Sequence, residues 1–279
     1  MKIEMTNFHM HTSRCHHASG TDEQFVLEAI RNGYKKIGFS DHACWNFETG
    51  YKSHMRMTVE EFADYKKSVI NFKNRYKDKV DISLGMEAEY FPDLQDWLLR
   101  FCAEEDIEYL VFGNHFYKNE ELHVYYGNTR EQYTDSYFDM CVDGLKTGMY
   151  SYLAHPELIL RNEYLVWNDH IESQFARVCQ VCKDLDIPLE YNVLGMQMNE
   201  RTGFISYPHP KFWQLAGKMG CKAIIGMDAH CVNDLNKNLY FRAYEDLKSY
   251  GVTIVRDIKK IDYKKLLNDK KNNDLFIDK

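Results

Sequence analysis

The chain has 279 residues, of which 44% are hydrophobic and 28% are charged, a balance typical of globular proteins. Its formal net charge of −7 argues against a nucleic-acid backbone as the main partner, because proteins that bind nucleic acids usually carry a basic surplus. No apolar run approaches the roughly 20 residues of a membrane helix, and the opening residues lack the apolar stretch of a secretory signal. We therefore expect a cytoplasmic protein that binds neither nucleic acid nor membrane.

Short apolar runs of β-forming residues alternate with longer amphipathic segments along the chain. The predicted strands span residues 6–10, 36–40, 81–86, 109–113, 150–154, 188–193 and 222–227, with a further candidate at 252–255. Thr21 is expected to cap a helix that Gly33 ends. Thr58 and Glu61 form a T-x-x-E capping box, and Thr129 is a candidate start for another helix. Further helical patterns cover residues 93–105, 168–185, 210–219 and 236–250.

This alternation of strands and helices predicts a single α/β domain over residues 1–279, built on a parallel sheet. Seven or eight such units favour a closed barrel. The rival architecture, an open doubly wound sheet, usually carries a glycine-rich nucleotide loop after its first strand. The segment HMHTSRCHHASG at that place contains no G-x-G-x-x-G, so the barrel is the predicted architecture.

Potential metal ligands follow almost every predicted strand. His9 and His11 are two residues apart, so both imidazoles share one face of the first strand. In a barrel the C-terminal ends of the strands meet at one mouth, which brings residues that are distant in sequence together. The candidates are His9, His11, His16, His17, Asp41, His42, Glu87, Glu89, His115, His155, Asp228 and His230.

Nitrogen and carboxylate ligands of this kind suit zinc, manganese or iron better than calcium. The set is larger than one ion can coordinate, so two or three ions are expected to share it. The cysteines are read as thiols in a cytoplasmic protein. Cys179 and Cys182 form a C-x-x-C without a second pair, which argues against a zinc site there, and Cys15 is the cysteine that lies near the histidines.

Together the motifs resemble the signature of the polymerase and histidinol phosphatase (PHP) superfamily across nearly the whole chain. They appear in the family's order as H-M-H at 9–11, H at 17, S-D-H at 40–42, G-M-E at 85–87, G-N-H at 113–115, A-H-P at 154–156 and G-M-D-A-H at 226–230. The F-S-D-H segment at 39–42 and the E-Y-N segment at 190–192 are most similar to histidinol-phosphatases. The resemblance implies a distorted (β/α)7 TIM-like barrel that holds three metal ions.

The resemblance also implies which residues bind each ion, and it gives Glu87, Asp228 and His230 catalytic roles. The first ion would be held by His9, His11, Glu87 and Asp228, the second by Glu87, His115 and His155, and the third by His17, His42 and His230. Two positions stay open on spacing alone. His16 competes with His17, and Glu89 competes with Glu87 because both glutamates face the same side of a strand. The motif Gly-Met-Asp also replaces the family's commoner Gly-Ser-Asp.

The activity implied by the resemblance is hydrolysis of a small phosphate monoester by metal-bound hydroxide. L-histidinol phosphate, a substrate of histidine biosynthesis, is the leading candidate. Phosphate needs a cationic clamp, and Arg161 and Arg201 follow the fifth and sixth strands at suitable places. Asp41 is a candidate to orient a neighbouring imidazole, and Glu89 to support the metal ligands. Aromatic residues near the mouth that could shape a pocket are Trp45, Phe47, Tyr51, Phe116, Tyr117, Tyr125 and Tyr126.

Three alternatives remain open at this point. The substrate could be another phosphate monoester, since fold-level analogy does not fix it. An amidohydrolase-like metal hydrolase would use a metal-bridging lysine, but the fourth predicted strand ends in Gly113-Asn114-His115. A third alternative is a binding protein whose metal site has degenerated, but the full set of candidate ligands argues against it. The sequence does not predict an oligomeric state.

Overall fold

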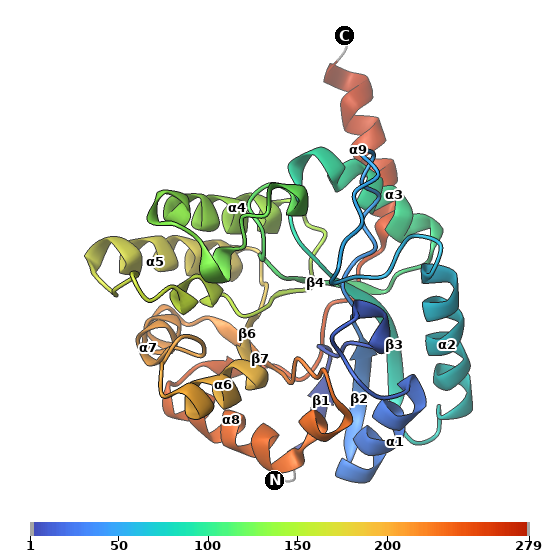
Figure 1. The fold of residues 1–279 in the computed structure, drawn as a ribbon, viewed down its shortest axis with the longest axis horizontal. Coiled ribbons are helices and arrows are strands. Elements are labelled where there is room, and N and C mark those ends of the chain that lie inside the picture. The colour runs from blue at the N-terminus through green and yellow to red at the C-terminus, as the bar shows by residue number, and fades with distance from the viewer. Residues whose placement is uncertain (1–2, 278–279) are drawn as a thin grey trace.

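The computed structural model describes residues 3–277 and shows parallel strands surrounded by helices (Figure 1). Over these residues, an eight-stranded sheet runs in the order β1-β2-β3-β4-β5-β6-β7-β8, which is the order of the sequence. The strands are β1 (Met5–Asn7), β2 (Tyr34–Phe39), β3 (Asp81–Ala88), β4 (Tyr109–Phe112), β5 (Tyr152–Leu153), β6 (Leu189–Asn192), β7 (Lys222–Gly226) and β8 (Thr253–Ile254). Every predicted strand is therefore confirmed, including the candidate at 252–255.

The sheet curls until the segments that follow β1 and β7 meet. Met10, after β1, forms a parallel bridge with Ala229, after β7. The backbone N–H of His11 donates to the carbonyl oxygen of Ala229 at 2.9 Å, and the N–H of Ala229 donates to the carbonyl oxygen of His9 at 3.2 Å. The short strand β8 pairs with the N-terminal end of β7. The predicted distorted (β/α)7 TIM-like barrel is confirmed, with β8 as an additional strand.

Helices connect the strands and pack around them (Figure 1). Within residues 3–277, no helix is both long enough and apolar enough to cross a membrane. The C-terminal helix α9 packs against α3. The helices are α1 (Asp22–Asn32), α2 (Phe62–Arg75), α3 (Gln95–Glu104), α4 (Thr134–Lys146), α5 (Asp169–Asp184), α6 (Val193–Thr202), α7 (Pro210–Met219), α8 (Lys237–Ser249) and α9 (Tyr263–Ile277).

Helix α1 begins and ends where its sequence signals predict. The Thr21 hydroxyl accepts from the backbone N–H of Gln24, whose side chain accepts from the N–H of Thr21, so the pair forms a capping box. Gly33 ends the helix with φ +90°, a left-handed conformation that costs glycine little. The same reasoning explains α5 and α8, which Asn168 and Asn236 cap.

Other helix starts were predicted less well. Thr58 and Glu61 make both hydrogen bonds of a capping box, but they stabilise a turn, and α2 begins only at Phe62. The prediction that Thr129 opens a helix is wrong: its N–H donates to the Asn162 side chain at 2.7 Å, and α4 begins at Thr134. Helix α6 was not predicted, because the run that ends β6 continues directly into it.

A compact apolar cluster fills the interior of the barrel. Tyr109 on β4 is buried there, and its hydroxyl lies 3.0 Å from the carbonyl oxygen of Phe8 and 3.1 Å from that of Phe39. The ring needs space that only glycine leaves on the neighbouring strands. A Cβ atom on Gly85 would lie 2.3 Å from the Tyr109 ring, and one on Gly38 would lie 2.0 Å from the hydroxyl oxygen. Tyr109 therefore sets the packing beneath the mouth of the barrel.

We predict that Gly85→Ala lowers the free energy of unfolding by about 1–3 kcal/mol, because the added methyl group overpacks the barrel interior. In a Tyr109→Leu background the same substitution should cost much less, since the ring that it meets is gone. Urea denaturation of the four proteins, followed by intrinsic fluorescence, measures both costs. An equal cost in the two backgrounds would contradict the contact.

Candidate metal centre

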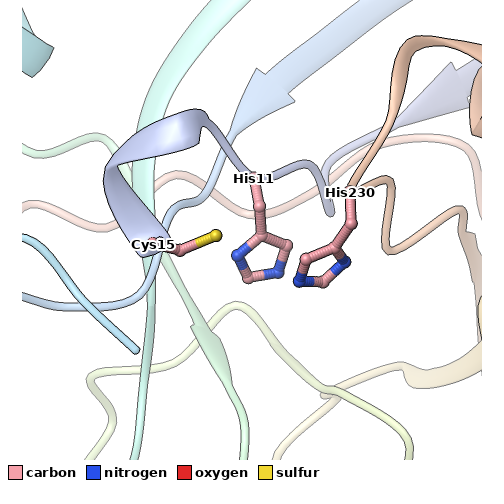
Figure 2. Close-up of side chains that lie close together, drawn as sticks. All are labelled: His11, Cys15 and His230. Carbon is pink, nitrogen blue, oxygen red and sulfur yellow. The ribbon is translucent and has the colours of Figure 1, made fainter. Parts of the chain in front are cut away.

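The C-terminal ends of the strands bring the predicted ligands together at one mouth of the barrel. His11 follows β1 and His230 follows β7, yet their rings stack with centroids 4.1 Å apart (Figure 2). This contact follows from the Met10–Ala229 bridge, which aligns the two segments. The other predicted ligands lie around this pair. They are His9, His17, His42, Glu87, His115, His155 and Asp228.

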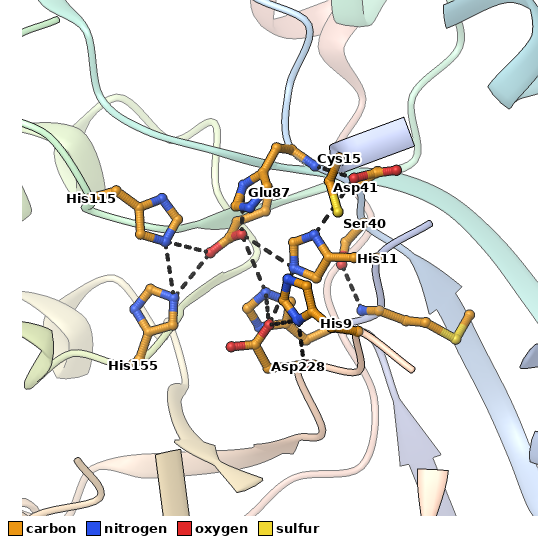
Figure 3. A network of polar contacts seen from close by, with 12 residues as sticks. His9, His11, Cys15, Ser40, Asp41, Glu87, His115, His155 and Asp228 are labelled. Carbon is orange, nitrogen blue, oxygen red and sulfur yellow. Dashed lines mark hydrogen bonds and ion pairs between the residues drawn. The ribbon is translucent and has the colours of Figure 1, made fainter. Parts of the chain in front are cut away.

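The first group is formed by His9, His11, Glu87 and Asp228, all of them buried (Figure 3). His9 Nε2 lies 3.4 Å from both Glu87 Oε2 and Asp228 Oδ1. His11 Nε2 lies 3.5 Å and 3.2 Å from the same two oxygens. Two ligands of a tetrahedral zinc ion, each about 2.0–2.2 Å from the metal, are roughly 3.3–3.6 Å apart. The four atoms are therefore spaced as the ligands of one ion would be.

The second group uses the other oxygen of Glu87. His115 Nε2 lies 3.2 Å from Glu87 Oε1, His155 Nε2 lies 3.0 Å from it, and the two nitrogens are 3.3 Å apart. These are again close to the separations between ligands of one zinc ion. Figure 3 shows the Glu87 carboxylate between the two groups, with one oxygen facing each. Glu87 therefore has the geometry of a bridging ligand.

The third group is more open. His17 Nε2 and His230 Nε2 lie 3.0 Å apart, and His42 completes a set whose ligand atoms all lie within 4.8 Å of one another. The Nδ1–H of His17 donates to the carbonyl oxygen of Cys15 at 2.6 Å, and that of His230 donates to the carbonyl oxygen of Asp228 at 2.9 Å. These bonds leave each Nε2 lone pair free for a ligand role.

Two competing assignments can now be compared. Both histidines are exposed, but His17 faces His230, whereas His16 ends the short helix Ser13–Cys15 in a left-handed conformation with φ +66°. Glu87 lies among the imidazoles of both groups, whereas Glu89 points to a different set of partners. The geometry thus favours His17 and Glu87.

The buried imidazoles carry nitrogens that lack a hydrogen-bond partner. They include His9 Nε2, both nitrogens of His11, Nδ1 of His42 and Nδ1 of His155. Leaving a buried polar atom unpaired costs roughly 1–3 kcal/mol. The Nε2 atoms of His9 and His11 both face carboxylate oxygens 3.2–3.5 Å away without forming a hydrogen bond to them. A cation between them would satisfy nitrogen and oxygen together, so the donors present fit a divalent metal.

The charges of the site support the same conclusion. Burial disfavours the ionised form of Glu87, yet the neighbouring His115, His9 and His42 hold its pKa well below its usual range. Burial lowers the pKa of His9, but Glu190, Asp228 and Glu87 together raise it well above its ordinary value. Without a metal, protons on His9 and His115, whose pKa values are raised, must therefore compensate for the carboxylates. A divalent cation provides the same compensation without them.

The imidazoles of the third group behave differently. Burial and the nearby His11 lower the pKa of His42 to about 3 and that of His230 to about 4. Both rings are neutral at pH 7, the form in which histidine binds metals. Cys15 is buried beside this group, with its sulfur directed towards the His11 ring (Figure 2). The sequence indicated this proximity but not the contact.

Further side chains hold the ligands in place, and sequence reasoning identified only some of them. His9 Nδ1 donates to Glu190 on β6 at 2.6 Å, and the other oxygen of Glu190 accepts from the backbone N–H of His155 at 3.0 Å. Asn192 donates to that oxygen and also to Asp228 Oδ2 at 3.1 Å. The E-Y-N segment at 190–192 is thus part of the site. The sequence showed the segment but not these contacts.

Asp41, the candidate to orient a neighbouring imidazole, lies next to His11. It is fully buried, and its Oδ1 lies 3.6 Å from His11 Nδ1. Its other oxygen accepts from the backbone N–H and the hydroxyl of Thr12. Asp41 therefore fixes the backbone that follows His11.

Two ligand candidates adopt backbone conformations that cost energy. His155 has φ +27° and Asp228 has φ +49°, in the left-handed region that non-glycine residues rarely occupy. Such strain is commonly retained where it positions a functional group. Here it directs both side chains towards Glu87 and His9.

A cavity of about 390 Å³ opens above the ligands. Arg161, at the end of the short helix Leu158–Arg161, lines it, and its guanidinium donates to the Tyr125 hydroxyl at 2.9 Å. Arg201, the second predicted phosphate clamp, does not line this cavity. It lies exposed on α6 and contacts Met198. The lining is formed by His17, His42, Met55, Glu87, His115, Tyr125, His155, Leu158, Arg161, Leu194, Tyr207, Asp228 and His230.

Of the aromatic residues expected near the mouth, Tyr125 lines the cavity, whereas Trp45 is buried and donates to Glu89 at 2.9 Å. Tyr207 also lines the cavity, with its ring 5.8 Å from that of His155. The sequence did not indicate Tyr207, because it lies in a loop far from any ligand motif. After β4, the second group contains His115 at the place where an amidohydrolase-like site would need a lysine.

The chain resembles known proteins in sequence and in fold. The chain is 22% identical over 229 residues to a Deinococcus radiodurans protein named "probable histidinol-phosphatase", covering 80% of this chain and 85% of that protein. It is 22% identical over 256 residues to the histidinol-phosphatase of Bacillus subtilis, covering 81% and 94%. A Lactococcus lactis histidinol phosphate phosphatase, solved with zinc, L-histidinol and phosphate, superposes with a TM-score of 0.70 at 16% identity, covering 91% and 98%.

Residues 7–194, more than half of the chain, match the sequence model of the PHP domain family. This range contains His9, His11, Glu87, His115 and His155, whose side chains form most of the first two ligand groups. The protein therefore belongs to the PHP domain family.

Proposed function

We propose that this protein is a metal-dependent phosphatase that hydrolyses a small phosphate monoester, L-histidinol phosphate, to L-histidinol and phosphate. The observation that carries the proposal is the Glu87 carboxylate, whose two oxygens face two separate groups of imidazoles at the base of a cavity. The names of the relatives and the ligands of the L. lactis structure support the choice of substrate. Residues 1–279 would act as one domain.

The proposed ligands bind two to three divalent transition-metal ions. His9, His11, Glu87 and Asp228 would hold one ion, and Glu87, His115 and His155 a second. The more open set of His17, His42 and His230 would hold a third. Ions bound there would supply the water activation and the charge compensation that hydrolysis of a phosphate ester needs. Zinc is supported by the nitrogen-rich ligands and by the zinc of the L. lactis structure, and manganese and iron accept similar ligands.

The protein's own residues would bind and orient the substrate. Glu87, Asp228 and His230, which we propose as catalytic, all line the cavity, so a phosphoryl group at its base would meet them. Arg161 lies on the same lining and presents a planar guanidinium that can bond two phosphoryl oxygens. Met55, Leu158 and Leu194 line the cavity too and would exclude water from the organic part of the ester. A volume of about 390 Å³ suits a small molecule.

A panel of phosphate monoesters that includes L-histidinol phosphate tests the substrate. Protein of known metal content should release phosphate from L-histidinol phosphate with the highest kcat/KM, lose activity with a chelator and regain it when metal is added back. Faster turnover of another monoester would retain the phosphatase and reject the substrate. If the metal-loaded protein hydrolyses none of these monoesters, the proposed phosphatase activity is wrong.

We expect zinc-loaded protein to hold two to three ions per chain, because two groups of atoms are spaced as the ligands of one ion each and a third group is available. Elemental analysis after gel filtration measures the ratio. Saturation at one ion or at none would contradict the shared set of ligands.

Glu87→Gln should remove most bound zinc and nearly all activity, because the amide keeps the shape of the side chain but loses the charge that two ions share. Glu89→Gln is the variant for comparison, two residues further along the chain and just beyond the end of β3. At saturating zinc it should keep the wild-type stoichiometry. Elemental analysis and circular dichroism of both variants check metal content and folding. A larger loss of zinc in Glu89→Gln would reverse the assignment.

Arg161→Ala should leave the metal content unchanged and lower kcat/KM by roughly two orders of magnitude, because a charge-assisted contact is worth about 1.5–3 kcal/mol. Arg161→Lys should recover only part of the lost kcat/KM, since lysine restores the charge but not the planar guanidinium that bonds two oxygens. Steady-state kinetics of both variants give the answer. Wild-type kcat/KM in both would show that Arg161 does not bind phosphate.

A further inference from the structure

A buried arginine lies next to the metal centre without lining the cavity. Arg56 belongs to the loop between β2 and α2, and only 2% of its surface is exposed. Its Nη2 donates to Glu89 Oε1 at 2.8 Å and its Nη1 to Glu89 Oε2 at 3.1 Å, which is a two-pronged contact with one carboxylate. Nη1 also donates to the carbonyl oxygen of Ala43 at 3.0 Å, and Nε donates to Glu120 Oε2 at 2.7 Å. The guanidinium is therefore fixed on three sides.

The carboxylate that Arg56 grips also contacts a proposed metal ligand. Glu89 Oε1 accepts from Nδ1 of His115 at 3.0 Å. The opposite nitrogen of that ring, Nε2, lies 3.2 Å from Glu87 Oε1 and 3.3 Å from His155 Nε2. A hydrogen bond to Nδ1 fixes both the ring orientation and the tautomer, and leaves Nε2 with its lone pair towards the second group. A continuous set of contacts thus runs from Arg56 through Glu89 to His115.

The Ala43 contact acts on a second ligand. Ala43 follows His42 directly, and its backbone N–H donates to the carbonyl oxygen of Glu87 at 2.8 Å. With the Ala43 carbonyl held by Arg56, the backbone after His42 is bonded on both sides. The contacts of Arg56 on this side therefore lead to His115 through Glu89, and to the backbone of His42 and Glu87 through Ala43.

On its other side, Arg56 reaches the loops that border the cavity. Glu120 lies in the short helix Glu120–Leu122 and also accepts from the hydroxyls of Tyr51 at 3.2 Å and Ser53 at 2.5 Å. Met55, the neighbour of Arg56, lines the cavity. The loops that carry these residues are thus joined through Arg56 to the metal centre.

We propose that Arg56 is a positioning residue for the second ion: it fixes the Glu89 carboxylate, which in turn holds His115 in the orientation that binds metal. The proposal rests on the metal binding proposed above. Two buried carboxylates surround one guanidinium, so the local charge is negative and increases the basicity of the His115 ring as a ligand. Groups that orient a ligand in this way typically contribute 10–100-fold to metal affinity.

The test measures zinc affinity rather than activity. Wild type, Arg56→Lys, Glu89→Gln and the double variant are loaded with zinc and dialysed against a graded series of a competing chelator, and the zinc retained per chain is measured by elemental analysis. Both single variants should release one zinc ion at a roughly 10–100-fold lower concentration of the competing chelator than wild type does. The remaining zinc should be released at the same chelator concentration as in wild type. The double variant should release the more weakly held ion no more easily than Glu89→Gln, because both changes reach His115 through the same carboxylate.

Arg177→Lys is the matched control, since Arg177 pairs with Asp139 on the exposed outer side of α4 and α5. It should retain zinc like wild type. Replacing the Arg56 guanidinium could impair folding, so the fold of each variant is checked by circular dichroism. If Arg56→Lys does not fold, the zinc retention of Glu89→Gln alone tests the proposal.

Three results would overturn the proposal. The first is wild-type retention of every zinc ion in folded Glu89→Gln or Arg56→Lys. The second is equal weakening of all ions, and the third is an additive loss in the double variant, which would indicate a merely structural effect of the loop. Wild type that binds no zinc would overturn the proposed metal centre as well. Wild type that binds zinc but hydrolyses no phosphate ester would overturn the proposed phosphatase and leave the role of Arg56 intact.

Discussion

The need to compensate the buried charge of Glu87 governs the arrangement of the whole mouth of the barrel. A carboxylate removed from water is costly unless it is paired, and Glu87 is 1% exposed. The imidazoles that surround it come from the ends of β1, β2, β4 and β5, so the compensation exists only when those strands stand in their correct places. The fold and the site are therefore mutually dependent. A sheet with one strand out of register would leave Glu87 buried without its partners.

The main outline of this arrangement could be predicted from sequence because it depends on short-range rules. The two-residue repeat of a strand places His9 and His11 on one face, and the convergence of parallel strands brings His115, His155 and Asp228 towards them. The caps of α1, α5 and α8 depend only on neighbouring residues and were equally predictable. Where local signals compete with tertiary contacts, as at Thr129, the prediction was wrong.

The supporting residues could not be found in this way. Arg56 and Tyr207 lie far in sequence from the site residues that they contact, and nothing in their local patterns separates them from ordinary core or loop residues. The E-Y-N segment pointed to Glu190, but not to its contacts with His9 and His155. Arg201 illustrates the opposite error. Its position after the sixth strand suggested the mouth, but the unpredicted helix α6 carries it to the surface. The sequence thus indicated the side chains that could bind metal, but it did not indicate most of the residues that hold those side chains in place.

The bridge between Met10 and Ala229 has a consequence for the life of the protein in the cell. His9 and His11 flank one side of this bridge and Asp228 and His230 flank the other, so the backbone that completes the barrel is the same backbone that carries these proposed ligands. An ion held by His9, His11 and Asp228 would span the join between the first and last parts of the barrel. Separating them would then require releasing the ion, whereas a metal-free chain could open there and expose unpaired strand edges. Supply of metal would thus determine how long each molecule escapes proteolysis and aggregation, as well as how fast it works.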